Sequence, residues 1–447
     1  MSRTGEGSRK RRRRTRKDWR SRRHDEAMAE AAAAPAREPV IAHPLVPAGE
    51  PELVDDEAGL AEVLEVGRSA GCVAFDTEFI GEETYVPRIC LVQVATAERL
   101  WLLDPLAGLD VTPAWELVAD PDVVTVVHAG QQDLEPALRL LDRPPANVVD
   151  TQLAAAFLDL PHPLSLAAVV DLFLGVKLGK GLTFTRWDRR PLSRAHLGYA
   201  ADDVRYLVAA WRAIEAALED RGRLAWARAE CDEQVAPERF GFDVDRRTER
   251  IVGTRNFRPR QVAIVREVLV LRDGAARERN VPPRAFLRDE VILRLAKEMP
   301  ETLDALGEVK GLPRPVIESH GERLLGLIAE VKGRDPSELP SRVTDEESIR
   351  DRVAIDSAWS AAQVICRAAG VDPGLVSGRK EIARAWFAHQ RGRDLTAMFP
   401  GWRGEVLGEP LAALLRGEKG VAAGWADGTL RPAEGPGTAT PGVPVPA

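Results

Sequence analysis

The sequence predicts an α/β domain built on a mixed sheet, followed by all-helical bundles. Three observations lead to this prediction. Apolar runs typical of strands occur up to about residue 150, where they alternate with helical patterns. Beyond Arg221 the apolar residues recur at helical spacing alone. The chain of 447 residues also exceeds the usual size of one hydrophobic core about threefold, so we expect three folded units.

The strands of the α/β domain are expected over residues 71–79, 88–96, 99–104 and 123–128, with a further strand at 147–150. The first three follow one another so closely that we expect an antiparallel meander. Helical spacing predicts helices over residues 131–142, 151–158, 164–174 and 193–219.

Two acids end the first predicted strand, which reads GCVAFDTEF. Asp76 and Glu78 are two residues apart, and because side chains of a strand alternate between faces, both should point the same way. An acid after a strand is usually a turn residue or a helix cap, so this pair alone is not specific.

Three further candidates lie on predicted helices. Asp133 follows the strand pattern VVTVVHAG and opens a helix, where the helix dipole favours an acid. Tyr199 and Asp203 are four residues apart and share a helix face, whereas Asp202 points elsewhere. Taken singly, each also fits an ordinary helix N-terminal acid or a partly exposed helix face.

Only the five residues taken together point to a specific kind of site. Converging carboxylates repel one another unless a cation neutralises them. Hard oxygen donors, with no cluster of Cys or His nearby, favour Mg²⁺ or Mn²⁺ over Zn²⁺. Two such ions about 4 Å apart can stabilise both the attacking and the leaving oxygen of a displacement at phosphorus. The set therefore predicts a divalent-metal site that cleaves phosphodiester bonds.

The order D-x-E, H-x-G-x-x-D and Y-x-x-x-D, with RWDRRPLS before the last motif, resembles the DEDD exonuclease superfamily in its Tyr-containing subgroup, and within it the ribonuclease D family. The resemblance covers most of the range from Val54 to Ile214. It implies a ribonuclease H-like fold and the removal of single nucleotides from RNA 3′ ends as 5′-monophosphates. Gln131 and Gln132 stand where relatives often carry a small residue and an acid, which bears on rate or substrate preference.

The resemblance also implies a role for each motif residue. Asp76 would ligate both of two Mg²⁺ or Mn²⁺ ions, and Glu78 and Asp203 would complete the first. Asp133 would hold the second ion, largely through water. Tyr199 would orient the attacking water, so that all five residues are catalytic and the four acids are metal ligands.

A basic loop containing aromatics, VKLGKGLTFTRWDRRPLS, precedes the third motif. Its cations could contact the sugar-phosphate backbone of a nucleic acid, and they are Lys177, Lys180, Arg186, Arg189 and Arg190. Trp187 fits packing better than base stacking. Phe79 and Tyr85 are candidates for base stacking, and core packing explains each equally well. His128 lies at a strand end, where a structural histidine is more common than a catalytic base.

The chain divides into a disordered basic arm with an Ala/Pro linker (1–45), an exonuclease domain (46–220), a connector (221–255), a first helical domain (256–333), a second helical domain (345–418) and a disordered tail (430–447). The segments RDEVILRLAKEMP and HGERLLGLI resemble the helicase-and-RNase-D C-terminal (HRDC) domain. The segment FPGWRGEVLGEPLAALLRG resembles the more divergent second helical domain of ribonuclease D relatives. Both suggest auxiliary nucleic-acid binding, although a helical repeat with Arg outside is usually just a solvated bundle.

The net charge of −7 hides an asymmetry, because residues 1–23 hold twelve Lys or Arg against two acids. This arm is typical of disordered nucleic-acid-binding segments, with a merely solvated extension as the alternative. The four cysteines are scattered without CxxC pairing and are expected to be reduced thiols. No apolar run could span a bilayer and no secretory signal is visible, so we expect a cytoplasmic protein without membrane contact.

We therefore expect a metal-dependent 3′–5′ exoribonuclease that trims structured RNA such as transfer RNA precursors, while the helical domains grip the body of the substrate. A DNA 3′–5′ exonuclease stays open as an alternative, because the same metals cleave DNA and no contact to a 2′-hydroxyl is identified. A catalytically silent nucleic-acid-binding protein is the third interpretation, and the five intact positions argue against it.

Overall fold

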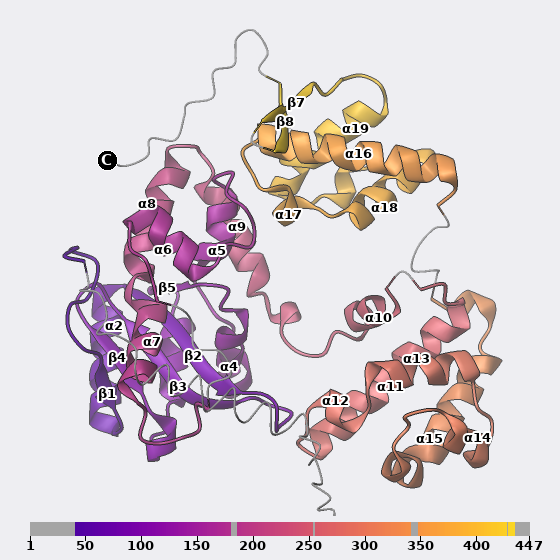
Figure 1. Ribbon diagram of the computed structural model, residues 1–447, viewed down its shortest axis with the longest axis horizontal. Helices are drawn as coiled ribbons and strands as arrows, with labels where there is room; N and C mark the ends of the chain where they lie inside the picture. The colour runs from indigo at the N-terminus through magenta and orange to yellow at the C-terminus, as the bar shows by residue number, and fades with distance from the viewer. Residues whose placement is uncertain (1–40, 180–185, 254, 341–346, 427, 434–447) are drawn as a thin grey trace, which may run out of the picture.

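A computed structural model of the protein describes residues 41–179, 186–253, 255–340, 347–426 and 428–433. An α/β domain lies on one side of Figure 1 and two helical domains lie on the other. The predictions for the basic arm and for most of the tail concern residues 1–40 and 434–447, which are outside the described residues. Within the described ranges, no helix is long and apolar enough to cross a membrane.

The sheet of the α/β domain has six strands in the order β1-β4-β3-β2-β5-β6. They are β1 (Glu52–Val54), β2 (Cys72–Ile80), β3 (Arg88–Ala95), β4 (Leu100–Leu103), β5 (Val124–Val127) and β6 (Val148–Asp150). β2, β3 and β4 form the predicted antiparallel meander. β5 pairs in parallel with both β2 and β6, and β1 in parallel with β4. The predicted mixed sheet and α/β fold are confirmed; only the three-residue β1 was not predicted.

Helices cover both faces of this sheet. They are α2 (Glu57–Ala70), α3 (Trp115–Val118), α4 (Gln131–Leu141), α5 (Thr151–Ala156), α6 (Leu166–Leu174), α7 (Arg194–Arg205) and α8 (Leu207–Glu219). Val73 and Phe75 of β2 belong to the core shared with α2, α3 and α4. Cys72 and Ala74 belong to the core shared with α5, α7 and α8. By the same alternation, residues 76 and 78 face α7, and residue 77 faces α4.

The single helix predicted over residues 193–219 is wrong, because the chain bends between α7 and α8. Tyr206 lies at the bend with φ −98° and ψ −9°. Its side chain is buried with Val46, Val170 and Ala209. The bend allows α7 to pack on β2, β3 and β4 while α8 packs on α5 and α6.

The first helical domain has a hydrophobic core of its own. Two connecting helices, α9 (Leu224–Gln234) and α10 (Val244–Val252), precede it. The domain comprises α11 (Pro259–Glu278), α12 (Pro283–Phe286), α13 (Asp289–Glu298), α14 (Leu303–Glu308) and α15 (Arg314–Gly333). It contacts the α/β domain through Tyr85, whose hydroxyl donates a hydrogen bond of 2.8 Å to Asp273 of α11. The guanidinium of Arg277 lies 5.2 Å from the centre of the Tyr85 ring.

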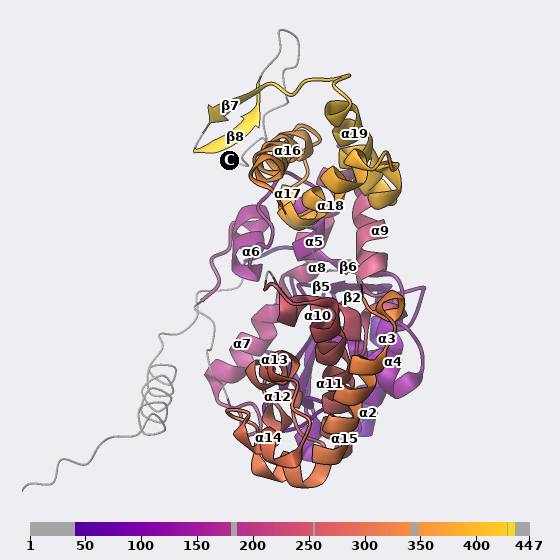
Figure 2. The ribbon, with the colours of Figure 1, turned by 90° about the vertical axis from the view of Figure 1, so that its right-hand side faces the viewer.

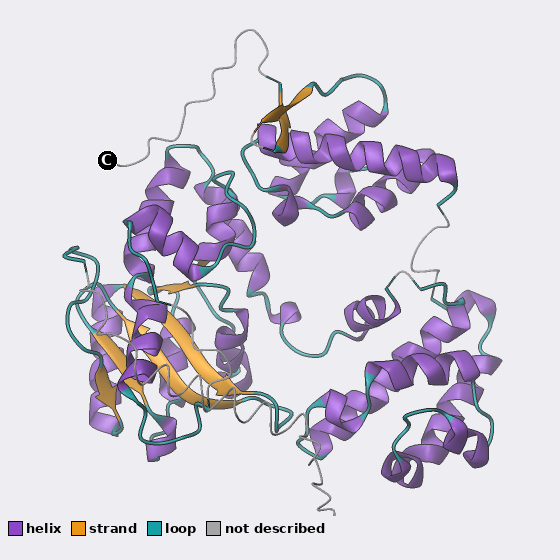
Figure 3. Cartoon of the chain, in the orientation of Figure 1, coloured by secondary structure: helices purple, strands orange, loops and turns teal. Residues whose placement is uncertain are grey.

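The second helical domain comprises α16 (Ile349–Ala368), α17 (Pro373–Val376), α18 (Arg379–Gln390), a π-helical turn (Gly404–Gly408) and α19 (Glu409–Leu415). Its buried residues share one continuous core with the α/β domain, and Figure 2 shows it beside α5 and α9. A hairpin of β7 (Ala423–Ala426) and β8 (Thr429–Pro432) follows. Among the described residues these are the only strands outside the α/β domain (Figure 3), so the tail expected to begin at residue 430 is corrected at its start.

Candidate active site

β2 places Asp76 and Glu78 on the face of the sheet that α7 covers. The parallel pairing of β2 with β5 ends at Ala74, opposite Val126, and beyond this point β2 pairs only with β3. The two acids therefore lie where β5 has already turned away from the sheet. Both side chains are half-buried.

The turn from β5 into α4 brings Asp133 to the same strand. A Cβ atom on Gly130 would lie 2.6 Å from the Cβ of Val127, so the sharp turn requires glycine at this position. Asp133 follows in the first turn of α4, where its carboxylate accepts a hydrogen bond from the Thr77 hydroxyl. The indole Nε1 of Trp115 donates to the Asp133 carbonyl at 2.8 Å. Asp133 thus lies on one face of β2, whereas Asp76 and Glu78 point to the other face.

α7 contributes Tyr199 and Asp203 one turn apart. The helix begins at Ser193, whose side chain caps it in a reciprocal arrangement with His196. Trp187, which is buried, lies with its ring centre 6.2 Å from that of Tyr199 and 5.3 Å from that of His196. These contacts fit the packing interpretation of Trp187 and fix the orientation of the Tyr199 ring.

β2 and α7, with residues that follow β5 or belong to α6 and α8, line a pocket of about 220 Å³. It is lined by Asp76, Thr77, Glu78, His128, Leu166, Tyr199, Asp203 and Leu207. Of the five predicted catalytic residues, only Asp133 lies outside this lining, behind Thr77. The ring nitrogens of His128 lie 2.9 Å from the Thr151 hydroxyl and 3.1 Å from the Leu164 carbonyl, which fits the structural role expected for this histidine.

The carboxylates of the site disfavour one another's negative charge. Burial raises the pKa of Asp76 well above its usual value, and the charges of Asp133, Asp203 and Glu78 raise it further. Burial, with Asp203 and Asp133, raises the pKa of Glu78 to about 9. Burial also raises the pKa of Asp133 to about 6. The pKa of Tyr199 is raised by burial and by three of these acids, so its phenol keeps its proton at neutral pH.

The donor chemistry fits a hard divalent cation, because carboxylate oxygens suit Mg²⁺ or Mn²⁺. An ion would also remove the mutual repulsion of the acids. Across the residues that the structure describes, no three acidic, His or Cys side chains already stand close enough together to hold an ion. The four acids are carried by β2, α4 and α7.

The four predicted nucleic-acid contacts have different surroundings. Phe79 is half-buried. The pairing of β2 with β3 shifts register between Glu78 and Phe79. Arg186 is exposed and binds both carboxylate oxygens of Asp188 at 2.9 and 2.7 Å. Arg189 is exposed, and Lys180 lies outside the described residues. Their contact with RNA stays a prediction.

Arg190 differs from its neighbours in the basic loop. Its guanidinium binds both carboxylate oxygens of Asp104, which follows β4, and donates to the Cys90 carbonyl at 2.7 Å. This engagement gives Arg190 a structural role, and its contact with RNA stays a prediction. The sequence pattern could not separate it from Arg189, because both are basic residues of one loop.

Sequence reasoning also missed the residues that support Asp133. Thr77 stands between the two strand acids, and the alternation of a strand already places it on the opposite face, so its contact with α4 could have been inferred. Trp115 lies 18 residues before Asp133 and carries no comparable signal.

Comparisons with known proteins agree with the geometry. The family model described as a 3′–5′ exonuclease matches residues 51–219, and the HRDC domain model matches residues 261–328. The ribonuclease D of Pseudomonas paraeruginosa is 33% identical over 369 residues, covering 82% of this chain and 98% of the relative. The ribonuclease D of Serratia proteamaculans is 32% identical, with 82% and 99% covered.

Among solved structures, that of Escherichia coli RNase D, described as an exoribonuclease involved in structured RNA processing, matches with a TM-score of 0.70 at 29% identity. The match covers 83% of this chain and 99% of that chain. A protein from Bifidobacterium adolescentis shares the fold, with a TM-score of 0.57 at 24% identity.

Fold, pocket and family models define a 3′–5′ exonuclease followed by an HRDC domain. The chain belongs to the ribonuclease D family, as its identity over most of the length of these relatives shows, and it is a 3′–5′ exoribonuclease. Apart from the start of the tail, the domain limits given above stay a prediction.

Proposed function

We propose that Asp76, Glu78, Asp133 and Asp203 hold two divalent ions, Mg²⁺ or Mn²⁺, with Asp76 shared between them. When bound, the ions supply the positive charge that stabilises the attacking and leaving oxygens of phosphodiester hydrolysis. The observation that carries this proposal is the convergence of Asp76, Glu78 and Asp203 on one pocket, with Asp133 behind Thr77. Burial and the charges of the neighbouring acids raise the pKa values of Asp76 and Glu78.

Tyr199 orients the attacking water in this proposal. Its hydroxyl is protonated at neutral pH, as in any tyrosine with the ordinary pKa of about 10, and burial raises the pKa further, so the hydroxyl can donate a hydrogen bond while remaining uncharged. The Trp187 ring packs near that of Tyr199, with the two ring centres 6.2 Å apart. Leu166 and Leu207 give the pocket apolar walls, which limit the number of water molecules beside the scissile phosphate.

The substrate that we assign is the 3′ end of structured RNA, with transfer RNA precursors as the principal case. The enzyme would remove one nucleotide at a time and release 5′-monophosphates in the cytoplasm. The description of the Escherichia coli relative as a structured-RNA-processing exoribonuclease supports this assignment. Phe79, Lys180, Arg186 and Arg189 would contact the RNA near the active site, and the helical domains would hold its body.

Counting bound ions tests the site without relying on activity. Titration of Mn²⁺ into the metal-free full chain, followed by calorimetry, should show two ions. Asp133→Asn should leave one, because it removes a ligand of the second ion. Asp202→Asn is the matched control, since the carboxylate of this neighbour of Asp203 lies 3.7 Å from Nε of Arg205 and outside the pocket lining, and it should retain two ions. Two ions in Asp133→Asn, or none in the wild type, would contradict the assignment.

The substrate is tested by competition among three strands with the same 3′ sequence: a 3′-extended transfer RNA, an unstructured RNA and a DNA. We expect the transfer RNA precursor to be shortened to its mature end and the DNA to be the poorest substrate. Equal rates on RNA and DNA would contradict the assigned preference.

A further inference from the structure

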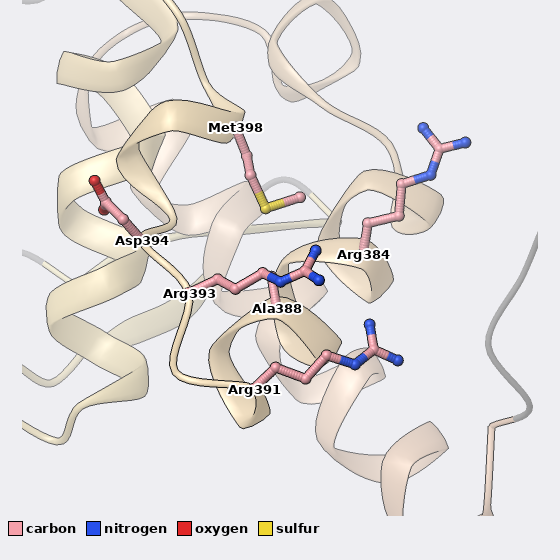
Figure 4. A pocket seen from close by; sticks show the side chains of 6 residues that line it. All are labelled: Arg384, Ala388, Arg391, Arg393, Asp394 and Met398. Carbon is pink, nitrogen blue, oxygen red and sulfur yellow. The ribbon is translucent and has the colours of Figure 1, made fainter. Parts of the chain in front are cut away.

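A pocket of about 290 Å³ lies on the second helical domain, at the end of α18 (Figure 4). Two of the charged side chains that line it have partners within the chain. Arg384 forms an ion pair of 3.0 Å with Glu249 of α10, and Asp394 accepts a hydrogen bond of 2.9 Å from the Thr396 backbone. A buried polar group without a partner is stronger evidence for a functional contact, and such a group lies beside the catalytic acids.

Gln93 lies within β3, and its side chain is fully buried. Among the residues that the structure describes, neither the nitrogen nor the oxygen of its amide has a hydrogen-bond partner. An amide offers two N–H donors and an acceptor oxygen, and leaving these groups buried and unpaired is unfavourable. An apolar side chain of similar size would be more stable at this position if packing were its only role.

Gln93 is the cross-strand neighbour of Asp76. The antiparallel pairing of β2 with β3 places the two residues directly opposite each other. Opposed residues of antiparallel strands point to the same face, with Cβ atoms about 4.5–5.5 Å apart. Both side chains therefore lie on the face that α7 covers. Rotation about the side-chain bonds of Gln93 can bring its amide to the Asp76 carboxylate.

The neighbours of Gln93 narrow the choice of partner. In the core on this face, the sheet contributes Leu91, Ala95 and Leu102, and α7 contributes Ala200, Ala201 and Val204, none of which carries a polar side-chain atom. Asp104, which follows β4, already binds Arg190 through both carboxylate oxygens. Among the strand residues on this face, the carboxylates of Asp76 and Glu78 then stand as acceptors. Asp76 is the nearer, because Glu78 lies diagonally across from Gln93.

We propose that Gln93 is a positioning residue for the reaction, whose amide N–H group donates a hydrogen bond to the Asp76 carboxylate and fixes its orientation for metal binding. The Thr77 hydroxyl makes the corresponding contact with the Asp133 carboxylate. Hydrogen bonds of this kind orient ligating carboxylates and raise metal affinity. Gln93 is fully buried and outside the pocket lining, so it acts through Asp76 and not on RNA. The inference rests on the proposed function, in which Asp76 is the shared ligand.

The test uses Gln93→Met in the full chain, because methionine keeps the length of the side chain and removes the amide. Calorimetry with Mn²⁺ alone should still show two ions, with a Kd raised about tenfold. The thermal midpoint in EDTA should equal or exceed that of the wild type, because an unpaired amide is gone. Gln93→Leu should behave in the same way.

A glutamine with a merely structural role would give the opposite pair of results. Its loss would lower the thermal midpoint in EDTA and leave the Mn²⁺ affinity unchanged. Unchanged affinity, a lowered midpoint, or failure of both variants to fold would each overturn the proposal.

Gln261→Met is the matched control. Gln261 lies in the first helical domain, and its amide oxygen accepts a hydrogen bond of 2.8 Å from the Arg258 backbone. This variant loses a paired amide away from the catalytic pocket and should keep the wild-type Kd for Mn²⁺. Equal rises of the Kd in Gln93→Met and Gln261→Met would overturn the proposal.

The kinetics of RNA hydrolysis add a second readout. In Gln93→Met, kcat should fall about tenfold, whereas KM should stay within about twofold, because the side chain does not touch RNA. A raised KM with unchanged kcat would place Gln93 in RNA binding and overturn its positioning role.

Mn²⁺ binding by the wild type separates this inference from the proposed function. If the wild type binds no Mn²⁺, the proposed two-ion site fails and the role of Gln93 fails with it. If the wild type binds two ions and Gln93→Met binds them equally well, the proposed site stands and the positioning role alone is overturned.

Discussion

Two groups of buried or half-buried carboxylates in this enzyme have neighbours of opposite charge. In the catalytic pocket Asp76 lies among Asp133, Asp203 and Glu78. At the joint between α9 and the second helical domain, the Glu230 side chain is fully buried against a cation. Its two oxygens each lie 2.8 Å from Arg403, and the indole of Trp402 donates to it at 3.2 Å.

The difference separates structural acids from functional ones. Arg403 of the second helical domain balances the charge of Glu230, so this buried ion pair joins α9 to that domain. In the pocket, burial and the charges of neighbouring acids raise the pKa values of Asp76 and Glu78, and an external cation would offset this unfavourable charge. Removing an acid should therefore cost stability at the joint, and activity but not stability at the pocket.

The largest effect is expected from Asp76→Asn. Turnover of RNA should fall by at least about 10³-fold, since metal-assisted charge stabilisation contributes several kcal/mol. Folding and RNA binding in EDTA should persist, because the substitution relieves repulsion. The measurement is single-turnover hydrolysis, with Asp202→Asn as the control that stays near the wild-type rate. Undiminished hydrolysis by Asp76→Asn would remove Asp76 from the site.

Glu230→Gln should have the next largest effect, and on stability. Breaking a buried ion pair typically costs about 3–5 kcal/mol, because the remaining charge stays buried without its partner. Denaturant unfolding of the full chain should report the loss. Glu233→Gln is the matched control, since Glu233 also contacts Arg403, at 3.3 Å, but is about half exposed and should change stability by less than about 1 kcal/mol. Equal stabilities of the two variants would contradict the contrast.

Tyr199→Phe should reduce turnover by about 10–100-fold, an effect of a size expected for lost orientation of a reactant. The phenyl ring should keep its packing against Trp187, so the count of bound Mn²⁺ ions and the thermal midpoint should stay at their wild-type values. A loss of metal binding in this variant would place Tyr199 among the ligands instead.

The smallest effect concerns pH in the absence of metal. The pKa of Glu78 is raised to about 9 in the folded chain, against about 4.3 when unfolded. Its protonated form therefore favours folding below the unfolded value, and this contribution is lost as pH rises toward about 9. In EDTA, Glu78→Gln should exceed the wild type in thermal midpoint by a margin that grows from pH 6 to pH 9, reaching roughly 2–4 °C. A margin independent of pH would show that burial and the neighbouring acids do not raise the pKa of Glu78.

The sequence was sufficient for the fold class and for bringing four of the five catalytic candidates to one pocket, because strand alternation and helical spacing place side chains on definite faces. It was insufficient where position depends on a distant partner. The pairing of Arg190 with Asp104 and of Glu230 with Arg403 joins residues 86 and 173 positions apart, and no local pattern marks them. The bend at Tyr206 was missed for the same reason, since the burial of that side chain depends on Val46 and Val170.

The most direct test follows a 3′-extended transfer RNA, labelled at its 5′ end, through incubation with the full chain in Mg²⁺, in Mn²⁺ and in EDTA. We predict a ladder of products that shortens from the 3′ end when either metal is present and an intact strand in EDTA. An unshortened strand in both metals, from protein that is folded and binds the RNA, would contradict the assignment of this pocket as a metal-dependent exoribonuclease site.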